Sequence, residues 1–251
     1  MDDTGYSAEL YLGARDYFKL RAAKFGDAVP IGMLGQIGLI LLWVLHGIAK
    51  LTGNYGIAIM LFSVLVTTCT APFTLMSLKS MKKMQQLKPQ IDKLMAQHKS
   101  DPDRANKEVF ALYKEHRVNP LSGCLPMFFQ LPIFFALFQA ITHFIELRGQ
   151  TFLWIKDLSL PDRLAQLPFS LPILGSDLNL LPFIMAGAMF MQTKVSQARM
   201  PSDPNNPTTK MFQGPMMSIV FCIMLYQVPA GLVLYWLTNS LASLTLYKIV
   251  K

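Results

Sequence analysis

Hydroxyl and amide side chains are the groups in this sequence that could form hydrogen bonds inside otherwise apolar segments, and their spacing is regular. Ser63, Thr67, Thr70 and Thr74 follow one another at intervals of four, three and four residues, which places them along one face of a helix. Such groups either hydrogen bond to neighbouring helices or hold water in a groove, and the spacing leaves both interpretations open. Further uncharged polar residues interrupt later apolar runs: Gln130, Gln139, Gln227, Thr238 and Asn239.

The sequence lacks the residue patterns of bond-making enzymes. Its four histidines have no second histidine or cysteine three or four residues away, and its three cysteines stand singly within apolar runs. That placement predicts free thiols that pack as small buried groups. No phosphate-binding glycine motif is present, and the apolar runs contain none of the charged residues that proton relays and ion-coupled carriers need. We therefore expect no enzymatic activity, no metal and no cofactor.

Composition indicates an integral membrane protein. Hydrophobic residues make up 52% of the 251 residues and charged residues 15%, against about 25% charged residues in a typical soluble domain. A helix needs about 20 residues to cross the hydrocarbon core, so the shorter candidate spans would require a locally thin bilayer. The candidates are residues 56–73, 121–145, 178–192, 211–228 and 230–247.

The distribution of charge predicts how these spans are oriented. Residues 78–119 carry ten of the 23 lysines and arginines, and the positive-inside rule places such a segment in the cytoplasm. Alternation of the spans then puts residues 146–177 outside and the C-terminus in the cytoplasm.

The basic segment 78–119 has a helical pattern of its own. Apolar residues recur at helical spacing on both sides of a turn at Asp101 and Pro102, where Asp101 suits the N-cap and Pro102 the first position of a helix. The pattern predicts an antiparallel helical hairpin. A disordered basic loop is the alternative.

Residues 31–49 form one more apolar stretch, which hydropathy does not assign. Its polar and aromatic residues, among them Gln36, Trp43 and His46, suit a helix that lies in the membrane interface. A helix that crosses the membrane remains possible on hydropathy alone.

Three runs resemble one family of membrane proteins. The motif VNPLSGCLP at residues 118–126 is followed by QLPIF at 130–134, and PAGLVLYWLTN stands at 229–239. In this order the motifs resemble the YidC-type membrane protein insertases of bacteria, which share a family with mitochondrial and chloroplast insertases. The segments LKPQI at 87–91 and ALYK at 111–114 resemble the two arms of that family's cytoplasmic hairpin.

The resemblance implies an all-α integral membrane protein with five transmembrane helices around a hydrophilic groove. Residues 53–251 would form this core, including the cytoplasmic helical hairpin at 78–119. Residues 31–52 would be an outer interfacial amphipathic helix, and residues 1–30 the remnant of an extracytoplasmic domain and its linker.

The implied function is that of an insertase and chaperone in the bacterial inner membrane. It would move substrate transmembrane segments from the cytoplasm into the bilayer without nucleotide hydrolysis. The implied partners are nascent membrane proteins and anionic lipids, with the general secretion channel and the ribosome left open, and no DNA. A channel or small-solute carrier and a structural assembly subunit are the alternative functions.

The resemblance and the polar pattern together predict three sets of functional residues. The substrate groove would be lined by Ser63, Thr67, Thr70, Gln130, Thr238 and Asn239. The path along which a substrate slides into lipid would be flanked by Tyr235, Trp236, Met217 and Phe221. The hairpin would make contacts through Lys82, Lys83, Lys88 and Lys93.

The sequence departs from the family at one groove position. Members generally carry an arginine five residues before the proline that ends the first core span. That proline is Pro72 here, and residue 67 is a threonine. Attraction of acidic substrate tails by a groove cation is therefore not predicted for this chain, whereas hydration by hydroxyl groups is.

Overall fold

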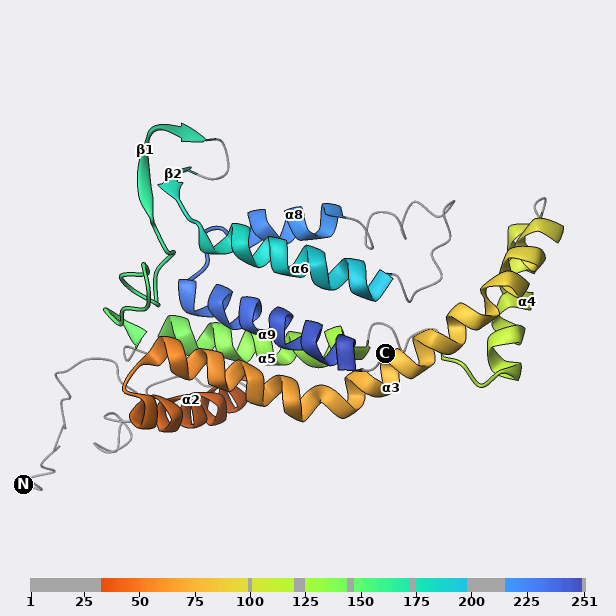
Figure 1. Ribbon diagram of the computed structural model, residues 1–251, viewed down its shortest axis with the longest axis horizontal. Coiled ribbons are helices and arrows are strands. Elements are labelled where there is room, and N and C mark those ends of the chain that lie inside the picture. Colours follow the sequence, from red (N-terminus) through yellow and green to blue (C-terminus); the bar gives the residue numbers. More distant parts are fainter. Residues whose placement is uncertain are drawn as a thin grey trace, which may run out of the picture.

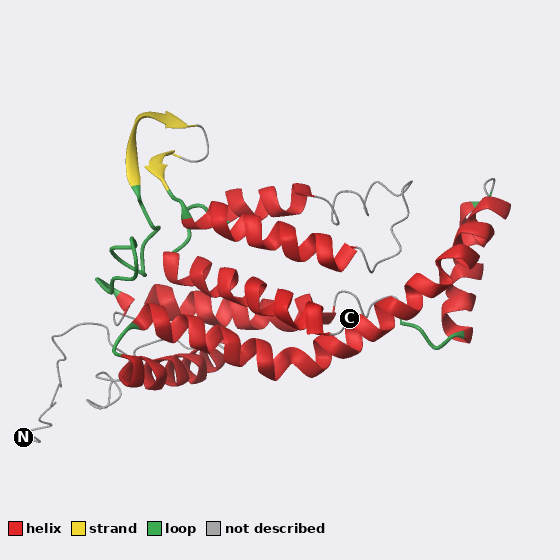
Figure 2. Cartoon of the chain, in the orientation of Figure 1, coloured by secondary structure: helices red, strands yellow, loops and turns green. Residues whose placement is uncertain are grey.

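The computed structural model describes residues 33–98, 101–119, 125–143, 147–171, 175–197 and 215–249. The chain is mostly helical, and Figure 1 shows a bundle of helices from which one helical hairpin projects. The strands that the structure describes form a single small sheet at the opposite end from this hairpin (Figure 2). Residues 1–30, the predicted remnant of an outer domain, lie outside the described residues.

The first described helix, α2 (Met33–Thr52), packs against α3 and α5. It buries Leu42, Leu45 and Ala49 and leaves Trp43 69% exposed on its other side. A Cβ atom on Gly38 would lie 2.8 Å from the Ala136 carbonyl oxygen of α5, so the absence of a side chain lets the two helices approach closely. Whether α2 lies in the membrane interface stays a prediction.

Helix α3 (Tyr55–Gln97) runs without a break from the first apolar stretch into the basic segment. Asn54 caps its start by accepting hydrogen bonds from the backbone N–H groups of Gly56 and Ile57. Pro72 and Pro89 lie inside the helix. Within the described ranges, α3 is the one helix both long and apolar enough to cross a membrane.

The remaining helices begin within or close to the apolar stretches that the sequence analysis singled out. They are α5 (Leu125–His143), α6 (Leu181–Gln197), α8 (Pro215–Met224) and α9 (Ala230–Ile249). Helix α9 packs against α3, α5 and α6, and α6 also packs against α8. Helix α8 has only 10 described residues, fewer than the 18 residues of the predicted span.

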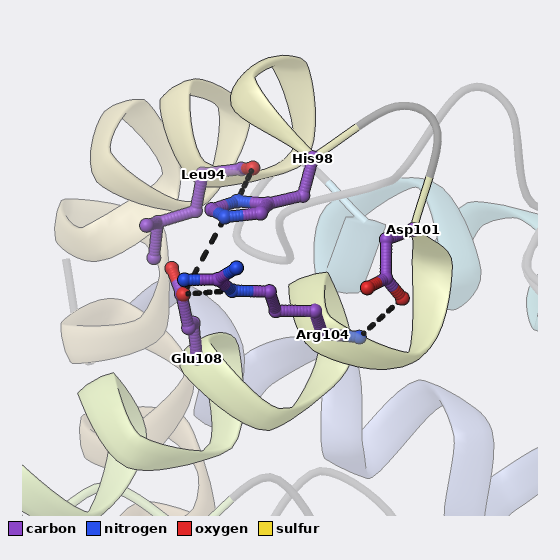
Figure 3. Close-up of polar contacts among 5 residues, drawn as sticks. All are labelled: Leu94, His98, Asp101, Arg104 and Glu108. Carbon is purple, nitrogen blue, oxygen red and sulfur yellow. Dashed lines mark hydrogen bonds and ion pairs between the residues drawn. The ribbon is translucent and has the colours of Figure 1, made fainter.

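The projecting hairpin consists of the end of α3 and α4 (Pro102–Glu115), which lie side by side in Figure 1. Asp101 is the N-cap and accepts a hydrogen bond from the Arg104 backbone at 3.1 Å, and Pro102 starts the helix, as the sequence predicted. Glu108 joins the two arms, because its Oε1 lies 3.5 Å from Nε2 of His98, the residue that caps the end of α3 (Figure 3). Within α4 the same oxygen accepts a hydrogen bond from Arg104 Nε at 3.3 Å.

The hydrophobic core includes buried residues of α2, α3, α5, α6 and α9, and Phe221 of α8 packs against it. Leu45 of α2, Phe62 of α3 and Leu137 of α5 are at most 2% exposed, as are Met185 of α6 and Leu232 of α9. Many large apolar side chains face outward instead, including Ile219 and Ile223 of α8, which is expected where the surroundings are lipid. Cys222 is buried as predicted, but the prediction was wrong for Cys69, which is exposed on this apolar outer surface of α3.

A loop with a small antiparallel sheet connects α5 to α6. The sheet pairs β1 (Ala165–Leu171) with β2 (Gly175–Leu178). Carbonyl oxygens of Leu158 and Leu160 accept hydrogen bonds from Gly231 and Ala230, the first N–H groups of α9, at 2.9 and 2.8 Å. The loop therefore satisfies backbone donors that have no partner within the helix itself.

Candidate functional site

An uncharged polar network links α3, α5 and α9 inside the bundle. The Thr67 hydroxyl donates to Asn239 Oδ1 at 2.8 Å, and Asn239 Nδ2 donates to Gln130 Oε1 at 3.0 Å. Gln130 Nε2 in turn donates to the Tyr235 hydroxyl at 2.9 Å. We call Thr67, Gln130, Tyr235 and Asn239 the interior network. It combines residues separated by as many as 172 positions in the sequence.

The geometry of the helices explains why these residues meet. Tyr235 and Asn239 are one turn apart on α9 and therefore share a face. That face lies against α3, where Thr67 is 5% exposed, and Tyr235 itself is fully buried. The Tyr235 ring packs with its centre 6.2 Å from that of Phe62. Amide groups both donate and accept, so Gln130 and Asn239 can connect the two hydroxyls without a charge.

The hydroxyl stripe on α3 is satisfied within the helix. Each of the four hydroxyls donates to the carbonyl oxygen four residues earlier, at distances between 2.7 and 3.2 Å. Ser63 is 0% exposed and Thr70 half-buried. The single Thr67 proton can serve either the Ser63 carbonyl oxygen or Asn239. In this structure the stripe therefore faces the interior of the bundle, and Ser63 does not line an open surface.

Thr238, a sixth residue of the predicted groove, lies outside the network. Its hydroxyl donates to the Leu234 carbonyl oxygen of its own helix at 2.9 Å, and the residue is 8% exposed. Of the predicted groove residues, the structure thus joins Thr67, Gln130 and Asn239 directly to one another.

The predicted sliding path divides into two places. The Trp236 ring packs between Phe134 of α5 and Phe221 of α8, with ring centres 5.3 and 5.2 Å apart. Met217 is half-buried one turn before Phe221 on α8. Tyr235, in contrast, points into the interior network and does not share this aromatic surface. The sequence analysis did not predict that Tyr235 points into the bundle or that Phe134 packs against Trp236. One signal was available: Tyr235 and Trp236 are consecutive residues of a helix, so their side chains point about 100° apart and cannot both face the same surface.

The four hairpin lysines lie on the part of α3 that projects from the bundle. Lys82, Lys83 and Lys93 are exposed and Lys88 is half-buried. Within the described ranges none of the four forms an ion pair. Their charges are therefore available to a partner outside the chain.

The loop after α5 holds the ends of three helices together. Asp162, 4% exposed, accepts hydrogen bonds through Oδ2 from the first N–H of α6, at Leu181, and from Trp154 Nε1. Asn179 donates to the Tyr226 carbonyl oxygen beyond the end of α8 at 2.6 Å. The Tyr226 hydroxyl donates back to the Asp177 carbonyl oxygen at 2.8 Å.

A second carboxylate, that of Asp157, stabilises the turn whose carbonyl oxygens accept hydrogen bonds from the start of α9. Burial tends to raise the pKa of Asp157, but the hydroxyl and backbone N–H of Ser159, with smaller contributions from Gly149 and Arg148, outweigh it and lower this pKa below its ordinary value. Both Ser159 groups donate to Oδ1, at 2.7 and 2.8 Å. The carbonyl oxygens that receive the first N–H groups of α9 flank Ser159 on either side.

The described residues contain no group of three or more histidine, cysteine or acidic side chains arranged to hold a metal ion.

Comparison with known proteins identifies the family. The family model of the 60Kd inner membrane protein matches residues 47–251. The chain belongs to this family. The resemblance drawn from the sequence motifs is thereby confirmed, and with it the assignment to an inner membrane protein family.

Individual relatives agree with this assignment. The membrane protein insertase YidC of Endomicrobium trichonymphae is 39% identical over 248 residues, which are 97% of this chain and 45% of that protein. The insertase YidC of Geobacter sp. (strain M21) is 39% identical over 238 residues, 94% of this chain and 41% of that protein. The chain thus spans less than half the length of these relatives.

One solved structure shares the fold. It is described as an active YidC insertase crystal structure with the first transmembrane domain resolved. Its sequence identity to this chain is 30% and its TM-score 0.64, over 90% of this chain and 49% of that one.

Proposed function

We propose that this chain acts as a membrane protein insertase, which moves transmembrane segments of its substrates from the cytoplasm into the bilayer without nucleotide hydrolysis. Membership of the inner membrane protein family and the printed names of the relatives support this function. The structural observation that carries it is the interior network, an uncharged polar site between apolar helices in which Thr67 and Tyr235 are buried and Gln130 and Asn239 half-buried.

The network has the chemistry that an entering polypeptide needs. A backbone that crosses hydrocarbon without partners for its N–H and C=O groups costs several kcal/mol, about 2–7 for each unpaired group. Amides and hydroxyls can pair with either kind of backbone group. They bind a neutral polar chain without the large desolvation cost of a buried charge.

We infer that the network alternates between two sets of partners. In the structure described here, which we take as the closed state, Thr67, Gln130, Tyr235 and Asn239 bind one another. Separation of α9 from α3 and α5 would free these groups to bind water and substrate backbone, with Ser63, Thr70 and Thr238 along the same groove. The aromatic surface formed by Trp236, Phe221 and Met217 would then guide the apolar part of the substrate into lipid.

In the proposed topology the chain crosses the inner membrane five times, with the hairpin and the C-terminus in the cytoplasm. The ten basic residues of segment 78–119 support this orientation through the positive-inside rule. The groove would open to the cytoplasm and be closed on the outside by the loop between α5 and α6. The proposed partners are nascent membrane proteins and anionic lipids; contacts with the general secretion channel and the ribosome are further proposals.

Reconstitution tests the proposed activity. Purified chain in vesicles of phosphatidylethanolamine and phosphatidylglycerol is expected to integrate a small single-span protein, measured by protease protection, without added nucleotide. A variant with leucine at Gln130 and Asn239 is expected to insert less, whereas Thr245→Val, at an exposed position whose hydroxyl bonds within α9, serves as the control. Passage of small solutes without integration would instead identify a channel or carrier, and neither activity would identify a structural subunit.

Thiol labelling tests the groove. In a background without the native cysteines, a cysteine at Ser63 or Thr67 is expected to react with a membrane-impermeant reagent from the cytoplasmic side only. Because both positions are buried in the closed state, substrate or thermal opening should accelerate the reaction. Reaction from the outside, or equal reaction from both sides, would contradict a groove closed to the outside.

A further inference from the structure

A crevice of about 390 Å³ lies between α6 and α8, away from the interior network. Its walls are almost entirely apolar. Phe183, Ile219 and Ile223 line it and are 47%, 58% and 46% exposed, so the crevice opens on the outer surface of the bundle. The other lining residues are Ala186, Phe190, Ser218 and Cys222. The aromatic surface at Phe221 faces α9 instead, so the two surfaces of α8 are separate.

Two polar groups mark one end of the crevice. The Ser218 hydroxyl is buried, the residue being 4% exposed, and it has no hydrogen-bond partner in the part of the chain that the structure describes. Lys194 places its Nζ 4.6 Å from the centre of the Phe190 ring, which lines the crevice. Helices α6 and α8 run antiparallel (Figure 1), so Ser218, near the start of α8, lies towards the Lys194 end of α6.

We propose that this crevice binds one acyl chain of an anionic phospholipid whose headgroup lies at Lys194. The lining residues Phe183 and Phe190 and the cation Lys194 follow one face of α6, over about 16 Å of helix rise. An acyl chain can lie along the apolar part while its phosphate meets the ammonium group.

Charge distinguishes a lipid from a substrate helix as the occupant of the crevice. A transmembrane segment of a substrate is apolar, whereas an anionic phospholipid brings an apolar chain to the walls of the crevice and a phosphate to the Lys194 ammonium group. The proposal rests on the membrane location of the family and is independent of the insertase activity.

Photolabelling tests the site on the full chain in vesicles. The vesicles would contain phosphatidylethanolamine with trace phosphatidylglycerol that carries a photoactivatable diazirine in its acyl chain. Labelled peptides from α6 and α8 are expected to exceed those from the exposed apolar surface of α3 at Leu65 and Met76 several-fold. Lys194→Gln should lower this labelling by about fivefold, the effect of about 1 kcal/mol for one basic residue at an anionic surface. Lys79→Gln, an exposed lysine on α3, should leave it unchanged.

Two further measurements distinguish the contribution of the lipid's acyl chain from that of its headgroup. Ala186→Phe fills the crevice and should reduce labelling of α6 and α8 to the level of α3, while unchanged α3 labelling reports that the variant is folded. Phosphatidylcholine with the same diazirine should label less than phosphatidylglycerol and should not respond to Lys194→Gln. Labelling of α6 and α8 at the α3 level in the unaltered chain, equal labelling by the two lipids, or displacement of the label by a transmembrane peptide would each overturn the proposal.

Discussion

Thr67 on α3 and Asn239 on α9, 172 residues apart in the chain, are joined by a hydrogen bond of 2.8 Å in the interior of the bundle. Asn239 continues the connection to Gln130 of α5 at 3.0 Å. Two amide-containing residues thus hold three helices together where hydrocarbon packing alone gives little preference for one arrangement. A helix arrangement maintained by a few such bonds can be both stable and able to open.

The contribution of this contact can be measured. Asn239→Leu removes both hydrogen bonds of the side chain and leaves Gln130 Oε1 without its donor. We expect the free energy of unfolding in detergent micelles to fall by about 1 kcal/mol, within the range measured for hydrogen bonds between transmembrane helices. Thr245→Val, on the exposed side of the same helix, should change it by less than about 0.5 kcal/mol. Equal effects of the two variants would show that the network does not stabilise the closed bundle.

Thr67 also offers a test of charge in the groove. Thr67→Arg would place a cation beside the oxygens of Asn239 and Gln130 at a position that is now 5% exposed. We expect it to increase insertion of substrates with acidic outer tails more than that of neutral substrates, because charges interact strongly in a low-dielectric site. Thr67→Gln introduces a long polar side chain without the charge and should not discriminate between the two substrates. An equal response of both substrates to Thr67→Arg would leave hydration as the function of this position.

Much of the helical framework could be predicted from the sequence. Each predicted apolar stretch overlaps one of the helices α3, α5, α6, α8 and α9, because long apolar runs leave few alternatives to a helix. The helix start at Asp101 and Pro102 was equally accessible, since the N-cap requires local chemistry only.

The parts that could not be predicted depend on neighbours distant in the sequence. Hydropathy does not reveal how α9 is rotated about its own axis. It therefore could not predict that Tyr235 points inward to Gln130, or that Trp236 faces Phe134 and Phe221. The exposure of Cys69 escaped prediction for a related reason: in a membrane the outer surface is as apolar as the core, so an apolar run does not reveal which side is buried.

The turn at Asp157 predicts a dependence of stability on pH. Its pKa is lowered in the folded chain, so the ionised carboxylate stabilises the fold. This contribution is complete above the ordinary aspartate pKa of about 3.9 and is lost as the pH falls through the lower folded-state pKa. We expect Asp157→Asn to lower the midpoint of thermal unfolding at pH 7, and the two midpoints to converge as the pH falls below the lowered pKa of Asp157. Ser159→Ala should reduce the same pH dependence, and a difference that stays constant with pH would contradict this role.

The basic hairpin gives the last prediction. Residues 78–117 carry ten basic and five acidic residues, whereas orientation of the spans requires only a few charges near their ends. The exposed lysines Lys82, Lys83 and Lys93 form no ion pair among the described residues, so their charges can bind anionic headgroups, at about 1 kcal/mol for each residue near the surface.

Replacing these three lysines with glutamine should therefore lower insertion in vesicles rich in phosphatidylglycerol and have little effect in neutral vesicles. The matched control replaces Lys107 and Lys114 on α4 and Arg117 just beyond it with glutamine, and removes the same charge. If the charge acts through the α3 arm nearer the bundle, the control should lose less activity than the α3 variant, while protease accessibility of the loops stays the same in both. Unchanged insertion in the α3 variant would show that the hairpin charge serves only to orient the spans. Equal losses of insertion in the two variants would show that the net charge of the hairpin matters and not its position.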